Sequence, residues 1–212
     1  MPDALGYDGF VRMLHGAIEE VRRNTDALSK LDSVGGDGDH GTTMARAMGN
    51  AEKAIADAKS RDLKDLLFDI GWAIMGVDGG ATGPLLGTLF LGMSEPAAGK
   101  TSLDAPALAA LFEAGLAALQ QQTRAKVGDK TMLDALIPAV AALRSAADAG
   151  QGVAAALRVA ADAAAEGAAS TKDFPARFGR AKNIGDRTIG HQDPGAASVA
   201  FIFRGFVGAT PT

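Results

Sequence analysis

The chain has 212 residues, which is enough for one large domain or two small ones with a substantial hydrophobic core. Its formal net charge of -4 offers no basic field to attract nucleic acid, and the lack of cysteine excludes disulfides and thiolate metal sites while fitting a reducing cytoplasm. Only 5% of the residues are aromatic in a chain rich in alanine and leucine, which favours packed helices over a β-sandwich.

The N-terminus reads Met-Pro-Asp-Ala-Leu-Gly and lacks the basic start and apolar stretch of a signal peptide. No segment approaches the run of about 18 apolar residues that a membrane span needs. We therefore expect a cytoplasmic protein that binds neither a membrane nor nucleic acid. Because no linker-like change in composition interrupts the chain, residues 1–212 are predicted to form a single domain.

The first part of the chain shows apolar residues at spacings of three and four, which is typical of amphipathic helices. A first helix is predicted from Gly9 to a terminus near Asp26. A second helix is predicted to begin at His40 or Gly41 and to continue to about Ala58. The segment between them is therefore a loop that leads into the N-terminus of the second helix.

Three carboxylates and four glycines occupy the segment 31–44, whose sequence is Leu-Asp-Ser-Val-Gly-Gly-Asp-Gly-Asp-His-Gly-Thr-Thr-Met. Asp32, Asp37 and Asp39 are hard oxygen donors, and a bent backbone around Gly38 can aim the last two at one cation. Mg²⁺ suits such a site because it keeps water and phosphate oxygens among its ligands, which indicates phosphate chemistry. The alternative is an ordinary Asp/Gly turn with solvated acids.

The start of the second helix adds groups that suit a phosphate. Helix N-termini attract anions, and Gly41, Thr42 and Thr43 offer close approach and hydroxyl donors there. His40 touches the acidic loop and is predicted to donate a hydrogen bond to a phosphate oxygen. Its other candidate role is that of a partner that orients Asp39.

The middle of the chain predicts three more helices, separated by a glycine-rich segment at 78–84 and by a second break before 104. These helices cover residues 62–77, 85–93 and 104–119. Trp72 and the methionines are assigned to the hydrophobic core.

The C-terminal part predicts three final helices, over residues 132–147, 150–168 and 196–207. A polar glycine loop at 127–132 precedes the first of them, and the segment 170–195 is rich in Gly, Lys, Arg and Asp. His191 falls in an Asp-Pro-Gly turn that needs no function. About eight helices result, which makes the predicted fold an all-α antiparallel bundle or barrel.

Loops at one end of such a bundle are expected to converge. If consecutive helices run up and down, one mouth is formed by the loops that start near residues 32, 79, 128 and 180. These loops offer carboxylates, small backbone and the charges of Lys130, Arg180 or Arg187. Taken singly, the loop at 79–83 is equally well explained as a plain connector between helices. The loop at 128–131 is equally well explained as a capped helix start.

An ordered set of five motifs spans nearly the whole chain. As a set, they resemble the nucleotide-binding L subunits of dihydroxyacetone kinases. The resemblance implies an eight-helix antiparallel barrel with the nucleotide at one end. The motifs are Leu31-Asp32 with Gly36-Asp-Gly-Asp-His-Gly41, Gly79-Gly-Ala-Thr-Gly-Pro84, Gly128-Asp-Lys-Thr-Met132, Gly179-Arg-Ala181 and Gly190-His-Gln-Asp-Pro-Gly195.

The same resemblance implies a set of site residues. Asp32, Asp37 and Asp39 are expected to hold two Mg²⁺ ions. The residues expected to line the phosphates are His40, Gly41, Thr42, Thr43, Ala81 and Thr82. Those expected to close around the nucleoside and its phosphates are Gly128, Ile137, Arg180, Asp193, Pro194 and Gly195.

The function implied is transfer of the terminal phosphoryl group of Mg-bound ATP to dihydroxyacetone or a related small ketose. In this family the ketose is held on a separate K subunit, so we expect no kinase activity from the chain alone. Either ATP exchanges freely, or ADP stays bound and is rephosphorylated by an M subunit of the phosphotransferase system. No residue in the sequence is an obvious catalytic base.

Two other functions stay open at the level of sequence. A non-catalytic ADP- or ATP-binding module that acts through protein contacts would carry the same motifs, and a helical scaffold without ligand is the plainest alternative. The sequence likewise leaves open whether the chain forms a homodimer.

Overall fold

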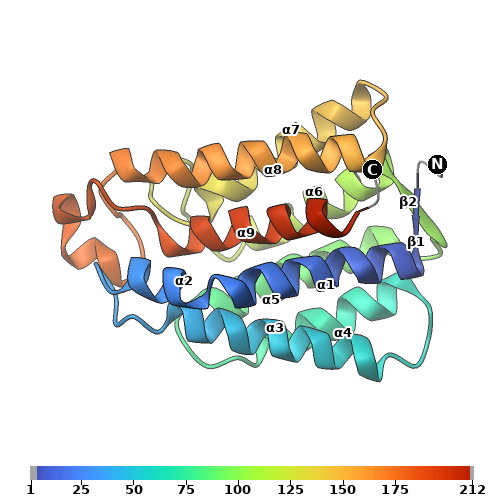
Figure 1. The fold of residues 1–212 in the computed structure, drawn as a ribbon, viewed down its shortest axis with the longest axis horizontal. Coiled ribbons are helices and arrows are strands. Elements are labelled where there is room, and N and C mark those ends of the chain that lie inside the picture. Colours follow the sequence, from blue (N-terminus) through green and yellow to red (C-terminus); the bar gives the residue numbers. More distant parts are fainter. Residues whose placement is uncertain (1–3, 211–212) are drawn as a thin grey trace.

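The computed structural model describes residues 4–210, and most of them are helical (Figure 1). Two short strands, β1 (Ala4–Gly6) and β2 (Ser102–Asp104), pair antiparallel with Ala4 opposite Asp104. Short 3-10 helices η1 (Thr171–Asp173), η2 (Arg180–Asn183) and η3 (Gly185–Thr188) lie between the last two α-helices. The α-helices of the described range are α1 (Tyr7–Arg23), α2 (Thr25–Asp32), α3 (His40–Asp57), α4 (Leu63–Met75), α5 (Thr82–Ala97), α6 (Ala105–Gln120), α7 (Leu133–Asp148), α8 (Val153–Ser170) and α9 (Pro194–Ala209).

The helices form a closed ring, so the predicted all-α fold is confirmed. Each helix from α3 to α9 packs along its neighbour in sequence, and α1 packs against both α9 and α3. In Figure 1, α1 lies between α9 and α3. Helix α2 continues the position of α1 in the ring, since it also contacts α3 and α9. The α-helices of the described range therefore fill eight positions, with α1 and α2 sharing one.

The first helix ends at Arg23, close to the predicted end near Asp26, but the residues that follow are helical rather than part of a loop. The chain breaks at Asn24 and resumes as α2, which continues to Asp32. Asn24 Nδ2 donates to the Glu20 backbone oxygen at 2.7 Å, and side chains that bond backbone carbonyls in this way compete with the helical ladder. The acidic loop is consequently confined to the short stretch between α2 and α3.

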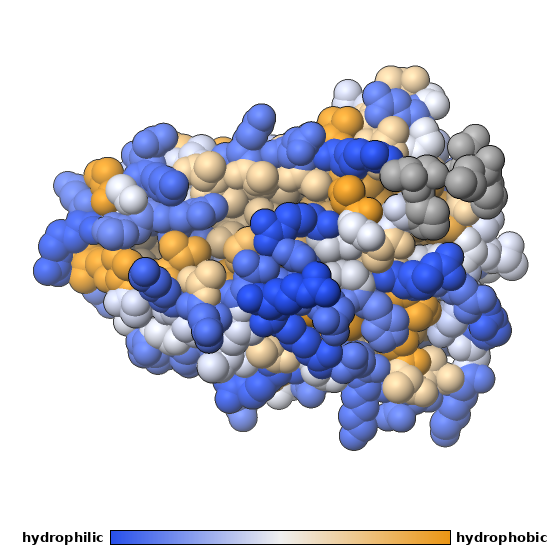
Figure 2. All heavy atoms as spheres, in the orientation of Figure 1, coloured by the Kyte–Doolittle hydropathy of each residue, from blue (hydrophilic) through white to orange (hydrophobic). Residues whose placement is uncertain are grey.

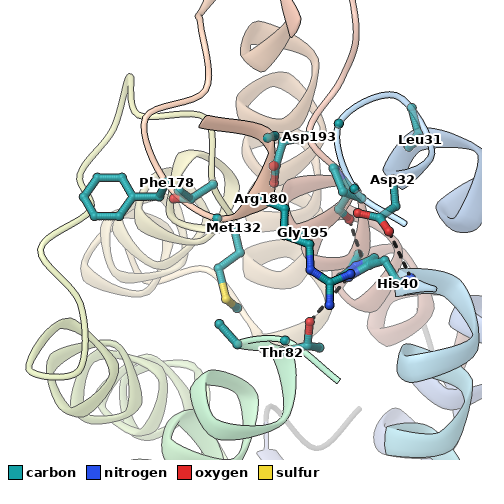
Figure 3. A pocket seen from close by; sticks show the side chains of 18 of the residues that line it. Leu31, Asp32, His40, Thr82, Met132, Phe178, Arg180, Asp193 and Gly195 are labelled. Atoms are coloured by element: carbon teal, nitrogen blue, oxygen red, sulfur yellow. Dashed lines mark hydrogen bonds between the residues drawn. The ribbon is translucent and has the colours of Figure 1, made fainter. Parts of the chain in front are cut away.

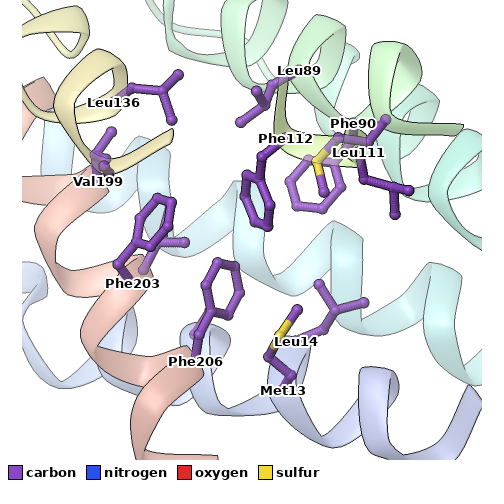
Figure 4. Close-up of a cluster of buried hydrophobic side chains, with 14 of the residues drawn as sticks. Met13, Leu14, Leu89, Phe90, Leu111, Phe112, Leu136, Val199, Phe203 and Phe206 are labelled. Atoms are coloured by element: carbon purple, nitrogen blue, oxygen red, sulfur yellow. The ribbon is translucent and has the colours of Figure 1, made fainter. Parts of the chain in front are cut away.

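Aromatic rings fill the centre of the barrel. Phe112 of α6 packs against Phe203 and Phe206 of α9, with ring centroids 5.3 and 5.9 Å apart, and Met13 and Leu14 of α1 lie beside them (Figure 4). All five side chains are buried, and aromatic pairs at these separations add to the stabilisation from burial itself. One continuous hydrophobic core extends from α1 to α9.

Glycine brings neighbouring helices close together. A Cβ atom on Gly16 of α1 would lie 2.3 Å from the Gly205 backbone oxygen of α9, and one on Gly87 of α5 would lie 2.8 Å from the Gly71 oxygen of α4. Any side chain at these positions would collide with backbone rather than with a flexible group. The small-residue composition therefore serves close helix packing, consistent with the dense interiors of proteins.

Trp72 corrects a second prediction, because 55% of it is exposed. It lies on the outer face of α4, where it meets the exposed Phe68 edge to face at 6.2 Å, while Ile70 and Ile74 of the same helix point into the core. The spacing of the apolar residues allowed either face of this helix to point inward. Among the methionines, Met13, Met44, Met48 and Met93 are buried as predicted.

Hydrophilic side chains cover much of the face of the molecule seen in Figure 2. Within residues 4–210, none of the helices combines the length and the apolar character needed to cross a membrane.

Candidate functional site

A cavity of about 350 Å³ opens at one end of the barrel, where the predicted loops converge. Its wall includes the acidic loop, the segment 79–82 before α5, the segment 130–133 before α7 and the segment 178–181 between α8 and α9. Figure 3 shows Asp32, His40, Thr82 and Arg180 gathered at this cavity. Residues that are far apart in the sequence thus meet because the ring places alternate loops at the same end.

Asp32, Asp37 and Asp39 form a cluster in the acidic loop. One carboxylate oxygen from each lies within 4.8 Å of the others. Asp32 Oδ2 accepts hydrogen bonds from the backbone N–H of Gly38 at 2.9 Å and of His40 at 3.4 Å, which ties the loop to the end of α2. Gly38 has φ of +78°, a conformation that costs glycine little and other residues more.

The donor set of this cluster fits Mg²⁺. Hard carboxylate oxygens are the ligands that this ion prefers, and it takes few of them because it keeps water and phosphate oxygens. Asp37 is exposed and the other two acids are half-buried, so space for such further ligands remains. That the cluster holds magnesium, and that it holds two ions, stay predictions.

Arg180 faces the acidic loop across the cavity mouth and forms an ion pair with Asp37. Burial raises the pKa of the Asp37 carboxyl, but hydrogen bonding to the Arg180 guanidinium contributes to a net shift below its ordinary value. Arg180 follows Gly179, whose φ of +65° lets the chain turn at this point. The Arg180 guanidinium thus lies against a cluster of acids. Its planar N–H donors can bind a phosphate group as well as a carboxylate.

His40 joins three helices at the floor of the site. Its Nε2 lies 2.8 Å from Ser198 Oγ of α9, and its Nδ1 lies 3.4 Å from Thr82 Oγ1 of α5. Ser198 Oγ donates to the Pro194 oxygen, so the network assigns the ring proton to Nε2, which donates to Ser198. Burial lowers the pKa of His40, against the opposing effect of Asp32 and Asp39, and the neutral ring is therefore favoured.

The glycine segment before α5 is held against α3. Arg46 Nη2 donates to Thr43 Oγ1 at 3.0 Å and to the Asp78 backbone oxygen at 2.9 Å. A Cβ atom on Gly79 would lie 2.7 Å from Thr43 Oγ1, so the loop reaches the cavity only because this residue has no side chain. The contact brings Ala81 and Thr82 to the cavity wall.

Comparison with known proteins identifies the family. A model described as "DAK2 domain" matches residues 34–208. The chain belongs to this family. Asp37 and Asp39 of the acidic cluster lie within the match, and Asp32 lies just before it. The expected family resemblance is therefore confirmed.

The relatives of this DAK2 domain include several subunits of similar length. The ADP-binding subunit DhaL of the PEP-dependent dihydroxyacetone kinase 1 of Listeria innocua is 38% identical over 92% of this chain and 93% of its own. The corresponding subunit of Escherichia coli is 36% identical over 85% of this chain and 86% of its own.

Longer relatives contain the domain as one part. The dihydroxyacetone kinase of C. freundii, solved in complex with AMP-PNP and Mg²⁺, superposes with a TM-score of 0.71 at 26% identity, over 92% of this chain and 33% of that one. The L-erythrulose 1-kinase of Mycolicibacterium smegmatis is 35% identical over 85% of this chain and 32% of its own. The DAK2 domain described here therefore spans about a third of the length of these two kinases.

Most of the predicted nucleotide contacts lie on the cavity wall of the DAK2 domain, but four do not. Gly41 packs against α2, where its Cβ would lie 2.0 Å from the Thr25 backbone oxygen, and Thr42 Oγ1 donates to the Asp39 oxygen. Gly128 donates its N–H to a neighbouring carboxylate, and Ile137 packs against the core. The nucleotide contacts of all four stay predictions.

Asp193 caps α9 at the other side of the cavity by accepting the Ala196 N–H at 2.7 Å. The residue is half-buried and lines the cavity. Burial raises the pKa of Asp193 to about 7, and Asp134 adds to this effect, while Lys130 opposes it. The pKa of this carboxyl thus lies near neutrality, unlike that of an exposed aspartate.

Ser198 lies on the cavity wall although the sequence did not predict it there, and Lys130 makes contacts other than the predicted one with the nucleotide. Lys130 is buried, and its ammonium donates to the backbone oxygens of Thr171 and His191. Ser198 lies one turn beyond Pro194 in a helix that the sequence did predict. The spacing of four residues between them, which lets the Ser198 hydroxyl donate to the Pro194 backbone oxygen, was the signal that could have placed Ser198 at the cavity.

Proposed function

We propose that this chain is the nucleotide-binding subunit of a kinase that phosphorylates dihydroxyacetone or a related small ketose. The observation that carries the proposal is the cluster of Asp32, Asp37 and Asp39 on the cavity wall. The near-equal lengths of this chain and the ADP-binding subunits support it, as does the resemblance to a kinase solved with AMP-PNP and Mg²⁺.

In this proposal the acidic cluster holds two Mg²⁺ ions, which supply neutralisation of the charge on the transferred phosphoryl group. The N-terminus of α3 borders the cavity and brings the positive end of a helix dipole toward the phosphates. Arg180 adds planar donors that match phosphate oxygens. The chain thus contributes positioning and electrostatic stabilisation, which account for most of the catalysis in phosphoryl transfer.

We place the ketose on a separate K-type subunit. The longer kinases that contain this domain have about two thirds of their length outside the matching part, which leaves room there for the acceptor. No cavity residue of the described chain is assigned as a base for the acceptor hydroxyl. The chain is accordingly expected to be active only together with its partner.

We further propose that ADP stays bound between turnovers and is rephosphorylated by an M subunit fed from the phosphotransferase system. The support is that relatives of similar length are named ADP-binding subunits of PEP-dependent kinases. The alternative, free exchange of ATP, predicts rapid loss of labelled nucleotide from the purified chain on addition of unlabelled ATP. Retention of the label favours bound ADP.

A reconstitution assay tests the proposed function. The purified chain is incubated with dihydroxyacetone, with and without a K-type subunit from the same source, and is supplied either with Mg-ATP or with an M subunit, the phosphotransferase-system proteins and phosphoenolpyruvate. The phosphorylated ketose is measured. Product is expected only when both subunits are present. Efficient turnover by the chain alone would contradict the need for a partner, and nucleotide binding without turnover in any combination would favour the non-catalytic module.

A further inference from the structure

Within the segment between α8 and α9, residues 172–191 form a compact loop whose ends meet, and we call this loop the cavity strap. The Gly190 N–H donates to the Lys172 oxygen at 2.8 Å and closes the loop, while the Ala176 N–H donates to Thr188 Oγ1 at 2.9 Å inside it. The middle of the strap supplies residues 178–181 to the cavity wall, including Arg180 (Figure 3). Whatever fixes the ends of the strap therefore also fixes Arg180.

Lys130 bonds to both ends of the strap. Its ammonium donates to the backbone oxygen of Thr171, just before the strap, and to that of His191, its last residue. Only 5% of Lys130 is exposed, and its backbone lies in the left-handed region at φ 60°. A residue other than glycine keeps such a conformation where its surroundings impose it.

Burial lowers the pKa of the Lys130 ammonium, and nearby acidic groups oppose this shift. Asp193, Asp134 and Asp173 all act on the ammonium, and they come from three different parts of the chain. Asp134 is itself buried and accepts the N–H groups of Gly128 and Thr131, so the loop that carries Lys130 is fixed at both sides. The lysine thus extends from a rigid base rather than from a mobile loop.

The residue before Lys130 binds the interior of the strap. The Asp129 backbone oxygen accepts the Arg177 N–H at 3.2 Å, and its buried carboxylate lies 3.6 Å from Arg177 Nη1. The loop before α7 therefore holds the strap at its two ends and at one point between them. The interior contact lies three residues before Arg180.

We propose that Lys130 is a positioning residue that holds the two ends of the cavity strap together and thereby keeps Arg180 over the cavity. This inference rests on the proposed function, because it assigns the strap the task of retaining Mg-ADP. Lys130 acts through the strap, because two of the three N–H donors of its ammonium are bound to backbone oxygens there.

The test compares Lys130→Met with Lys182→Met, which makes the same substitution at an exposed position of the same strap. Two quantities are measured: hydrogen exchange of the strap amides in the ligand-free chain, and the dissociation rate of a fluorescent ADP in the presence of Mg²⁺. Lys130→Met is expected to speed exchange in residues 172–191 selectively. Dissociation should become about tenfold faster, because hydrogen bonds from a charged group are lost. Lys182→Met should change neither quantity.

Three outcomes would overturn the inference. Exchange that rises equally in all helices would mean that Lys130 supports only global folding. Faster strap exchange with an unchanged dissociation rate would mean that the strap does not retain nucleotide. Unchanged strap exchange would mean that Lys130 does not anchor it. A wild-type chain that does not bind Mg-ADP contradicts the proposed function, while strap exchange still decides whether Lys130 is an anchor.

Arg177→Ala provides a second variant in case Lys130→Met fails to fold. The Arg177 side chain is 63% exposed, so its loss leaves the core intact. Removing the ion pair between Arg177 and Asp129, while the backbone hydrogen bond between them stays, is expected to speed strap exchange around residue 177 and to raise the dissociation rate of Mg-ADP about threefold. Strap exchange and dissociation at wild-type rates in a folded Arg177→Ala chain would contradict the anchoring of the strap by the loop before α7.

Discussion

Burial sets the charge of individual side chains at the cavity. The ring of His40 is held neutral between α3, α5 and α9, and Asp193 at the N-terminus of α9 has its pKa raised to about 7. The acidic cluster could be predicted from sequence because its three aspartates are close neighbours in the chain. The pairing of His40 with Ser198 could not, since 158 residues separate the two.

The raised pKa of Asp193 predicts a pH dependence of stability. The native state holds this proton up to about pH 7, whereas an unfolded chain releases it near its ordinary pKa of 3.8. Between these values the native state binds more protons than the unfolded state, so this carboxyl makes the free energy of unfolding fall as pH rises. Asp193→Asn keeps the capping oxygen and should remove that fall.

Urea denaturation of both chains at about pH 4.5 and about pH 8 measures the effect. Carboxyls with lowered pKa values, such as Glu52 and Glu113, act in the opposite sense in both chains and cancel in the comparison. The variant should gain stability relative to wild type as pH rises. A difference between the two chains that does not change with pH would refute the shifted pKa.

Close contact between helices decides how the elements assemble. Apolar periodicity predicted the helices, but it did not predict the break at Asn24. That break depends on a hydrogen bond from the Asn24 side chain to the backbone of the preceding turn. The two strands were missed because three residues are too few to show an alternating pattern. Trp72 was assigned to the wrong face, since periodicity marks a stripe without naming every residue on it.

Two glycine substitutions should have opposite effects on stability. Gly205→Ala puts a Cβ atom 2.4 Å from the Gly16 backbone oxygen at the contact of α9 with α1, and is expected to lower the free energy of unfolding by about 1–3 kcal/mol. Gly49→Ala in α3 meets nothing within 4 Å and is the matched control, expected to raise that free energy by roughly 0.5–1 kcal/mol. Urea denaturation distinguishes them, and equal effects would argue against the close contact.

The closed ring of helices explains why the candidate site lies at one end of the molecule. It brings the loop before α3, the loop before α5 and the strap before α9 to a single cavity. The sequence predicted this convergence from helix count alone, because an up-and-down order places alternate loops together. It could not predict which side chains turn inward, and Lys130, expected to offer charge to the nucleotide, instead binds the strap.

The proposed function requires that the acidic cluster bind a nucleotide through magnesium. Calorimetric titration of Mg-ADP into wild type, Asp37→Asn and the control Asp69→Asn tests this claim, since Asp69 is exposed on α4 away from the cavity. Loss of one hard ligand should weaken Mg-ADP binding about tenfold or more in Asp37→Asn, with metal-free ADP affected far less and the control unchanged. Equal Mg-ADP affinity in all three chains would contradict the claim.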